Sequence, residues 1–183
     1  MHFPFNEKKA SQAAAFILMR HEGSLNYMLL NKLLYYSDRE ALLTRGAPIT
    51  GDLMVSMDYG PVLSTVLDFI RHTREPGPDW KAYIERAPNY TVRLRVDNPV
   101  IDELSKFELE ILQAVDEKHG SKDPFDLSQE SHALPEWIDP HGCSIPIPFE
   151  NVLELEHSSA QDIRDTQSNA QIEWFFRHLE EPD

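Results

Sequence analysis

His141 and Cys143 are the residues of this chain whose types could support covalent chemistry. A cysteine becomes a nucleophile when a neighbouring base lowers its pKa, and a third group usually orients that base. Here one glycine separates the two residues in a loop rich in proline, and no third member of a triad is evident. We therefore interpret Cys143 as an inert loop thiol and predict no catalytic residue.

Metal binding is a second chemistry to weigh, because His132, Asp139 and His141 occur in one region and Asp126 lies nearby. Neither an HExxH nor a CxxC spacing accompanies them. Pro135 also interrupts the helix that would have to present His132. Capping and hydrogen bonding are the better interpretation of these side chains, and we predict neither a metal nor a cofactor.

Phosphate binding and glycoside hydrolysis also lack a specific pattern. The chain has seven glycines, and none belongs to a GxGxxG motif or to a GxxxxGK motif followed by Ser or Thr. Its 31 Asp and Glu residues make accidental carboxylate pairs unavoidable, so their number does not indicate a glycosidase.

The elements that position these side chains are mainly helical, and the strongest pattern covers residues 25–45, with Ser24 as its cap. Leucines recur at fourfold spacing and form a buried stripe: Leu25, Leu29, Leu30, Leu33 and Leu34. This spacing predicts four charged residues on the opposite side or at the margin of the stripe: Lys32, Asp38, Arg39 and Glu40.

The flanking segments add shorter elements. Residues 8–21 have the composition of a helix, and residues 49–58 alternate as a short strand or wing would. The pair Gly60–Pro61 predicts the start of another helix. Two strands, 80–86 and 90–96, are expected to form a hairpin.

The second half of the chain is helical and acidic. Residues 105–108 form a capping box, Asp123 and Pro124 open a short helix, and residues 134–149 contain four prolines and predict an ordered loop. A last helix, capped by Ser159, is expected to end near Leu179. Apolar side chains expected to face inward are Trp137, Ile138, Ile145 and Ile147 in the loop, and Ile163, Ile172, Phe175 and Phe176 in the last helix.

These elements predict an α+β fold that is mainly α-helical. It has a helical core, a small β-wing or hairpin compatible with a winged-helix-like organisation, and an acidic helical C-terminal half. The length suits a single domain over residues 1–183, with a helical and wing half at 1–97 and an acidic half at 98–183.

The net charge of −14 is unevenly distributed. Residues 1–95 hold 12 Lys and Arg against 10 Asp and Glu, whereas residues 96–183 hold 5 against 21. The acidic half repels phosphate and would attract a basic partner, although acidic surfaces also serve solubility alone. A winged-helix DNA-binding regulator is an alternative, because six arginines could form one basic face: Arg39, Arg45, Arg71, Arg74, Arg93 and Arg95. The intervening carboxylates make nucleic acid an unfavoured partner.

Targeting signals are absent from the pattern of the sequence. Its N-terminus lacks the apolar run of a signal peptide, and the longest apolar run, Ala13–Met19, is too short to span a bilayer. One cysteine excludes an internal disulfide and suits a reducing compartment. We expect a soluble, cytoplasmic protein that does not bind a membrane.

Four stretches in order resemble the Panacea (SocA-like) antitoxin domain, which is found in toxin–antitoxin operons and phage-associated proteins. They are KLLYYSDREALLTRGAPITGD, VSMDYGPVLSTVLDFI, LSKFELEILQAVDEKHG and SQESHALPEWIDPHGCSIPIPFENVL. The resemblance covers about Lys8 to Leu155. It departs from the pattern at Asp58–Tyr59, where some relatives carry another pair before the glycine.

The resemblance implies a bacterial antitoxin without enzymatic activity that binds and neutralises a cognate toxin protein encoded beside it. One branch of the family instead acts as an adaptor that delivers its toxin to an ATP-dependent protease, so such a protease is a second expected partner. The resemblance further assigns a partner-binding cluster at Tyr35, Asp38, Arg39, Tyr59 and Pro61. The alternative is that these residues serve packing, with Asp38 and Arg39 as a local ion pair.

Overall fold

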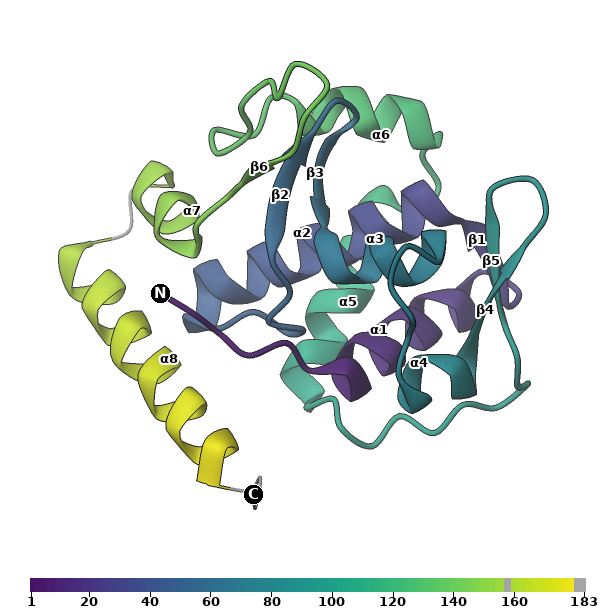
Figure 1. The fold of residues 1–183 in the computed structure, drawn as a ribbon, viewed down its shortest axis with the longest axis horizontal. Helices are drawn as coiled ribbons and strands as arrows, with labels where there is room; N and C mark the ends of the chain where they lie inside the picture. Colours follow the sequence, from purple (N-terminus) through teal and green to yellow (C-terminus); the bar gives the residue numbers. More distant parts are fainter. Residues whose placement is uncertain (157–158, 180–183) are drawn as a thin grey trace.

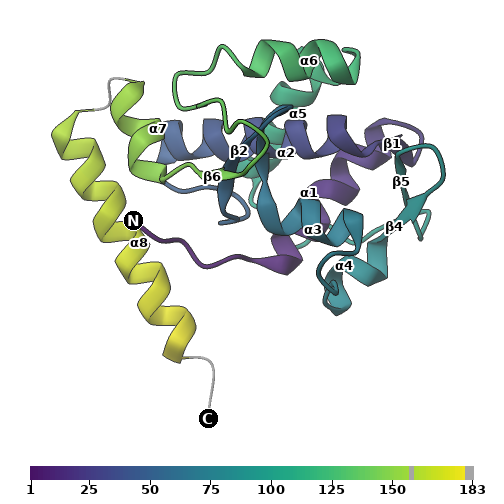
Figure 2. The same ribbon diagram turned by 45° about the horizontal axis from the view of Figure 1, so that its top comes forward.

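One helix, α2 (Tyr27–Arg45), runs through the middle of the molecule, and the other elements surround it (Figures 1 and 2). The computed structural model describes residues 1–156 and 159–179. Within that part the fold is mainly helical with small antiparallel sheets, as predicted. The remaining helices are α1 (Glu7–Arg20), α3 (Ser64–Arg71), α4 (Pro78–Tyr83), α5 (Lys106–His119), α6 (Pro124–Ser131), α7 (Phe149–Leu155) and α8 (Ala160–Leu179).

Two three-stranded antiparallel sheets flank α2. One has the order β1-β5-β4 and the other β3-β2-β6. The strands are β1 (Ser24–Asn26), β2 (Met54–Met57), β3 (Gly60–Leu63), β4 (Ile84–Ala87), β5 (Thr91–Leu94) and β6 (Ile145–Pro146). The β4–β5 hairpin confirms the predicted hairpin, although Trp80 belongs to α4 instead of the first strand.

Two predicted helix starts are wrong. Residues 24–26 pair with β5, so α2 begins at Tyr27 and its cap is Asn26, whose side chain accepts from Met28 N at 2.9 Å. The pair Gly60–Pro61 begins β3, not a helix. Proline is tolerated there because β3 is an edge strand, where a missing N–H breaks no ladder bond.

The C-terminal end of α2 and the starts of α5, α6 and α8 follow the predicted signals. Gly46 closes α2 in the left-handed conformation with φ of 71°. Ser105 and Glu108 form a capping box at α5, and Asp123 caps α6 by accepting from Phe125 N at 2.8 Å. Asp162 N donates to Ser159 Oγ at 3.1 Å at the start of α8. Local sequence therefore sets these boundaries.

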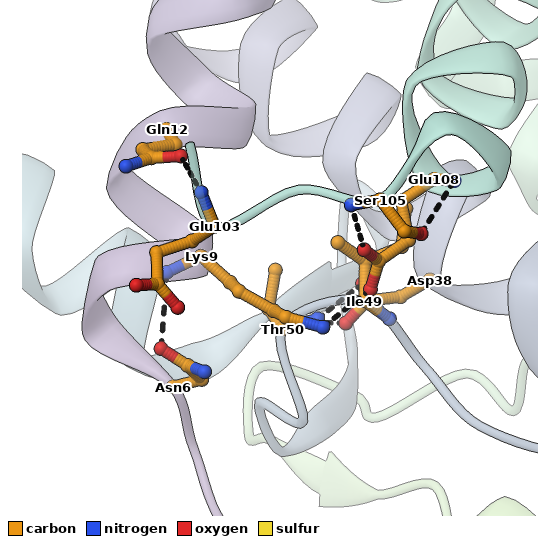
Figure 3. A network of polar contacts seen from close by, with 9 residues as sticks. All are labelled: Asn6, Lys9, Gln12, Asp38, Ile49, Thr50, Glu103, Ser105 and Glu108. Carbon is orange, nitrogen blue, oxygen red and sulfur yellow. Dashed lines mark hydrogen bonds and ion pairs between the residues drawn. The ribbon is translucent and has the colours of Figure 1, made fainter. Parts of the chain in front are cut away.

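The main hydrophobic core extends from Phe3 to Ala170 and contains the predicted leucine stripe. Ion pairs also join the first half of the chain to the second. They link Lys8 to Glu103, Lys9 to Glu108, Arg20 to Asp116 and Arg39 to Glu136. Figure 3 shows part of this contact, where Gln12 and Lys9 of α1 face Glu103 and Glu108. The cations of the first half thus neutralise part of the acidic half.

Helix α8 lies at one side of the molecule, beyond α7 (Figure 1). Ile163, Thr166 and Ala170 form the narrow stripe by which it packs on the body. Ile172 and Phe175 are 54% and 55% exposed, so their predicted inward orientation is wrong, because they lie off that stripe. The side chain of Phe176 lies outside the described part.

The proline-rich loop packs on β2 through some of its predicted anchors. Ile147 is buried, and the Trp137 indole donates to Met57 O at 3.1 Å. Ile138 is 58% exposed, so it is not an anchor. Its backbone N–H donates to Ser56 Oγ at 3.2 Å instead, which holds the loop without burying its side chain. No helix among residues 1–156 and 159–179 is long and apolar enough to cross a membrane.

Candidate functional site

Three of the charged residues of α2 are buried, contrary to the prediction that they lie on its opposite side or at the margin of the stripe, whereas Glu40 is exposed. Lys32 and Asp38 are 0% exposed and Arg39 is 9% exposed. The reason is that α2 is enclosed from several directions, by α1, α5, α6, α7 and β3. A helix in the centre of a fold has no outer side, so its charged residues need internal partners.

Asp38 of α2 holds the segment that follows the helix through hydrogen bonds to Ile49 and Thr50. Its carboxylate accepts from Ile49 N at 3.0 Å, Thr50 N at 2.9 Å and Thr50 Oγ1 at 2.5 Å (Figure 3). Burial raises the pKa of Asp38 to about 7, although the hydrogen bonds from Thr50 and Ile49 act in the opposite direction. Three donors to one carboxylate make Asp38 a residue that holds the turn.

Asp52 extends this arrangement to α3. Its side chain accepts from Thr65 N at 3.0 Å and Val66 N at 2.9 Å, so it caps a helix whose own N-cap, Leu63, has no polar side chain. Thr50 Oγ1 accepts from Asp52 N at 3.1 Å and so connects the Asp38 carboxylate to the backbone of Asp52. Burial also raises the pKa of Asp52.

Tyr35 and Arg39 converge on Glu136 of the proline-rich loop. Tyr35 OH and Arg39 Nε both donate to Glu136 Oε1 at 2.7 Å. Arg39 also pairs with Glu156, which follows α7. Burial opposes ionisation of Arg39, but the hydrogen bonds and charges of Glu136 and Glu156 outweigh it, so the pKa of Arg39 is raised. Arg39 does not pair with Asp38, so the alternative of a local ion pair is wrong.

Lys32 and Pro61 are connected at the other end of α2. Lys32 Nζ donates to Pro61 O at 2.7 Å, and Asn31 exchanges two hydrogen bonds with the backbone of Leu63, both 3.0 Å. A Cβ at Gly60 would lie 2.7 Å from Lys32 Nζ and 2.0 Å from Ser131 Oγ, so only glycine fits there. The β2–β3 hairpin is thereby held against α2.

The Lys32 ammonium lacks an acidic partner. No carboxylate of residues 1–156 or 159–179 lies within ion-pairing distance of it. Burial lowers the pKa of Lys32 to about 7. An unneutralised ammonium under an apolar surface makes that surface electropositive when it is protonated.

Tyr59 is the predicted site residue that faces solvent, at 58% exposure. It occupies the tip of the β2–β3 hairpin, where it borders a groove of about 520 Å³ that we call the aromatic groove. Its lining comes from the N-terminal end of α2, the β2–β3 hairpin, α3, the turn of the β4–β5 hairpin and α6. Figure 1 labels these elements. The lining consists of Asn26, Tyr27, Met28, Asn31, Lys32, Met57, Asp58, Tyr59, Val62, Leu67, Arg71, Tyr90 and Phe125.

Four aromatic rings from separate segments frame the aromatic groove. Tyr27 and Tyr90 have ring centroids 6.1 Å apart, and Tyr59 meets Phe125 edge-on at 6.4 Å. Tyr90 and Phe125 are 67% and 63% exposed. Exposed aromatic rings around an apolar floor are typical of a surface that binds another molecule.

Sequence reasoning missed Tyr90, Phe125 and Lys32 as members of a site, and considered Arg71 only for DNA binding. Tyr90 lies in the turn between β4 and β5 and has φ of 58°, and Phe125 lies in the first turn of α6 beside two acidic residues. A bulky aromatic residue at a turn or an exposed helix start buries little on folding. That misfit was the available signal for both rings.

The residues considered for chemistry are dispersed. Cys143 is exposed, and His141 lies 3.4 Å from Asp139 at the surface. His132 instead stacks on Trp137 with ring centroids 4.2 Å apart. Among residues 1–156 and 159–179, no group of three or more potential ligands is arranged to hold a metal ion.

The six arginines considered for DNA binding occupy different surroundings. Arg39 is buried against Glu136, and Arg45 lies 4.0 Å above the ring of Phe107. Arg93 and Arg95 both face Glu85, at 2.5 Å and 3.7 Å. At least these four have local partners.

Comparison with known proteins gives one family match. The family described as "Antitoxin SocA-like, Panacea domain" matches residues 30–138, which is more than half of the chain. No curated protein and no solved structure matches the chain. The matched segment contains most of α2, both strands of the β2–β3 hairpin and α6.

Proposed function

The chain belongs to the family of SocA-like antitoxins with a Panacea domain, and from this we propose that it binds and neutralises a cognate toxin encoded by the adjacent gene. The structural observation that supports a binding function is the aromatic groove. It combines three strongly exposed rings, Tyr59, Tyr90 and Phe125, with an apolar floor. Neutralisation then requires direct contact that covers a toxin surface, with no bond made or broken.

Long-range attraction and short-range anchoring have different sources in this proposal. The acidic second half attracts a basic, nucleic-acid-directed toxin and speeds encounter. The rings of the aromatic groove then provide affinity, because aromatic side chains dominate the energetics of buried interface centres. Affinity should therefore fall as salt rises, mainly through a slower association rate.

The predicted cluster divides into two roles under this proposal. Tyr59 contacts the toxin, since it is the exposed member. Tyr35, Asp38 and Arg39 are buried and position the elements beneath, and Pro61 anchors the hairpin through its carbonyl. These four are positioning residues.

The test is co-production with the product of the adjacent gene. That product alone should stop growth, and this chain should restore it, with the two proteins co-purifying as a complex. The toxin level should stay constant on rescue, because masking does not remove the toxin. Disappearance of the toxin in a protease-dependent manner would instead support delivery to an ATP-dependent protease. Failure of rescue and of complex formation would overturn the proposed function.

A further inference from the structure

We propose that the aromatic groove takes an apolar segment of the toxin that carries a carboxylate, and that Arg71 pairs with this carboxylate. The inference rests on the proposed function and specifies the chemistry of the partner. It differs from the long-range picture, in which the partner is basic as a whole. The two are compatible because a basic protein can present one acidic side chain at its contact.

The walls of the aromatic groove call for an apolar segment. Met28, Met57, Val62 and Leu67 line it beneath the rings. Val62 and Leu67 belong, with Val55, to a small apolar cluster separate from the main core. A volume of about 520 Å³ suits a few large side chains and is too small for a folded element. An extended or single-turn segment with bulky apolar residues fits this space.

Arg71 provides the charge that selects a carboxylate. It is the last residue of α3, is exposed, and lines the aromatic groove. No ion pair or hydrogen bond joins its guanidinium to any group of residues 1–156 or 159–179. Arg93, by comparison, pairs with Glu85. Among the described residues, the exposed Arg45, Arg74 and Arg86 also lack such a partner, and Arg71 differs from them because it lines the aromatic groove. A free guanidinium beside an apolar surface is suited to a planar, two-point contact with a carboxylate.

Beneath the aromatic groove lies a second basic group, Lys32, whose ammonium has the same positive sign as the Arg71 guanidinium. Lys32 underlies the groove without a neutralising carboxylate. Asp58 is the acidic residue of the lining, and its Oδ1 already accepts from Gly142 N at 2.9 Å. The lining of the aromatic groove therefore carries two basic groups, Lys32 and Arg71, against one carboxylate, on a chain whose net charge is −14.

A single carboxylate fits this area better than a polyanion does. Asp58 lies within the lining, and Asp123 and Asp126 flank Phe125 at the start of α6. These carboxylates repel the repeated phosphates of a nucleic acid, whereas one carboxylate can pair with Arg71 and keep away from them. The acidic surroundings also set the register of the segment, since a displaced carboxylate would meet like charge.

The first experiment compares Arg71→Glu with Arg74→Glu in full-length chains. Both changes reverse an arginine near the end of α3, but Arg74 lies outside the lining, 5.9 Å from the ring of Phe69. With the purified product of the adjacent gene, we expect Arg71→Glu to raise Kd about tenfold or more. Arg74→Glu should change it by about twofold at most. Equal effects of the two variants would overturn the inference.

The second experiment identifies the segment. Overlapping short peptides of the toxin are tested for binding to this chain and to Tyr59→Ala. We expect the binding peptides to combine large apolar residues with Asp or Glu, and to lose binding when the acid becomes Asn or Gln. Reversing that acid to Arg in the intact toxin should restore affinity for Arg71→Glu. Binding peptides without an acid, or no restoration, would overturn the inference.

These experiments distinguish failure of the inference about Arg71 from failure of the proposed toxin-binding function. If the wild-type chain forms no complex with the toxin, both fail. If the complex forms and Arg71→Glu leaves it unchanged while retaining the thermal transition of the wild type, the function stands and the inference fails. Circular dichroism melting of each variant supplies this comparison, because Arg71 and Arg74 are exposed.

Discussion

The two ends of α2 treat buried charge in opposite ways. At the C-terminal end, Asp38 receives three hydrogen bonds and Arg39 meets the carboxylates of Glu136 and Glu156. At the N-terminal end, Lys32 has a single carbonyl partner and lies beneath an apolar, ring-lined groove. We call the C-terminal end of α2 the saturated end, because its buried charged groups have internal partners. We call the N-terminal end the groove end, where the Lys32 ammonium has no internal carboxylate partner among the described residues.

This contrast teaches that a polar residue on the central helix can serve folding or recognition according to its neighbours. A buried charge with matched partners holds elements in place and has nothing left for an external molecule. A buried charge without a counter-ion destabilises the free protein and is relieved when a partner supplies the opposite sign. We therefore expect substitutions at the saturated end to affect stability, and substitutions at the groove end to affect binding.

The largest effect should come from Glu136→Ala at the saturated end. This change leaves the buried Arg39 guanidinium and Tyr35 hydroxyl without their main acceptor. We expect the free energy of unfolding to fall by about 3–5 kcal/mol, measured by chemical denaturation. Glu156→Ala is the matched control, because it also removes a carboxylate from Arg39 but at an exposed position. Equal losses in the two variants would contradict the saturated-end interpretation.

A smaller loss is expected for Asp38→Ala. It leaves Ile49 N, Thr50 N and Thr50 Oγ1 without an acceptor, which should lower the free energy of unfolding by about 2–4 kcal/mol. Because the folded-state pKa of Asp38 is raised from 3.8 to about 7, its ionisation opposes folding, and wild-type stability from this group declines as pH rises between these values.

Denaturation from pH 4 to pH 7 tests that sign. The difference between wild type and Asp38→Ala should shrink over this range, since the variant lacks the group that loses stability. Glu40→Ala, an exposed carboxylate of the same helix, should show neither the loss nor the pH dependence. A difference that grows with pH would refute the assignment.

At the groove end, Tyr59→Ala should weaken toxin binding without affecting folding. Loss of an exposed ring at an interface centre removes about 2 kcal/mol of binding free energy, which is roughly thirtyfold in Kd. The thermal midpoint should stay close to that of the wild type, because Tyr59 is largely exposed. Ile172→Ala on α8 is an exposed apolar control outside the aromatic groove. An equal loss of affinity in both would place the contact elsewhere.

The smallest effect concerns the pH response of Lys32→Met. The folded-state pKa of Lys32 is lowered from 10.5 to about 7, so its stabilising contribution is complete above the upper value and is lost as pH falls through the lower one. Between pH 7.5 and pH 8.5, wild-type stability should rise by about 1 kcal/mol relative to the variant. Parallel stability curves over that interval would show that Lys32 has a counter-ion.

Sequence reasoning recovered features that depend on neighbouring residues. The capping box of Ser105 and Glu108, the cap at Asp123 and the left-handed end at Gly46 are specified within a few positions of the chain. The start of α8 after Ser159 was recovered in the same way. The family itself could be identified because its signature stretches are continuous.

Features that depend on distant segments could not be obtained in that way. Periodicity assigned Lys32 and Asp38 to the outside of a helix, since it does not reveal that other elements enclose that helix. Glycine and proline at 60–61 suit both a helix start and an edge strand, and the pairing with β2 decided between them. The rings of the aromatic groove come from four separate segments, so no local sequence pattern predicts it.

The pairing of Arg39 with residues far along the chain has a consequence for synthesis on the ribosome. Glu136 follows Arg39 by 97 positions and Glu156 by 117, so the central helix cannot settle into its site while these acids are still untranslated. A nascent fragment that ends before the proline-rich loop therefore holds an unmatched guanidinium where the finished protein has a filled interior. Native packing around Arg39 is therefore completed only after Glu156 has been synthesised.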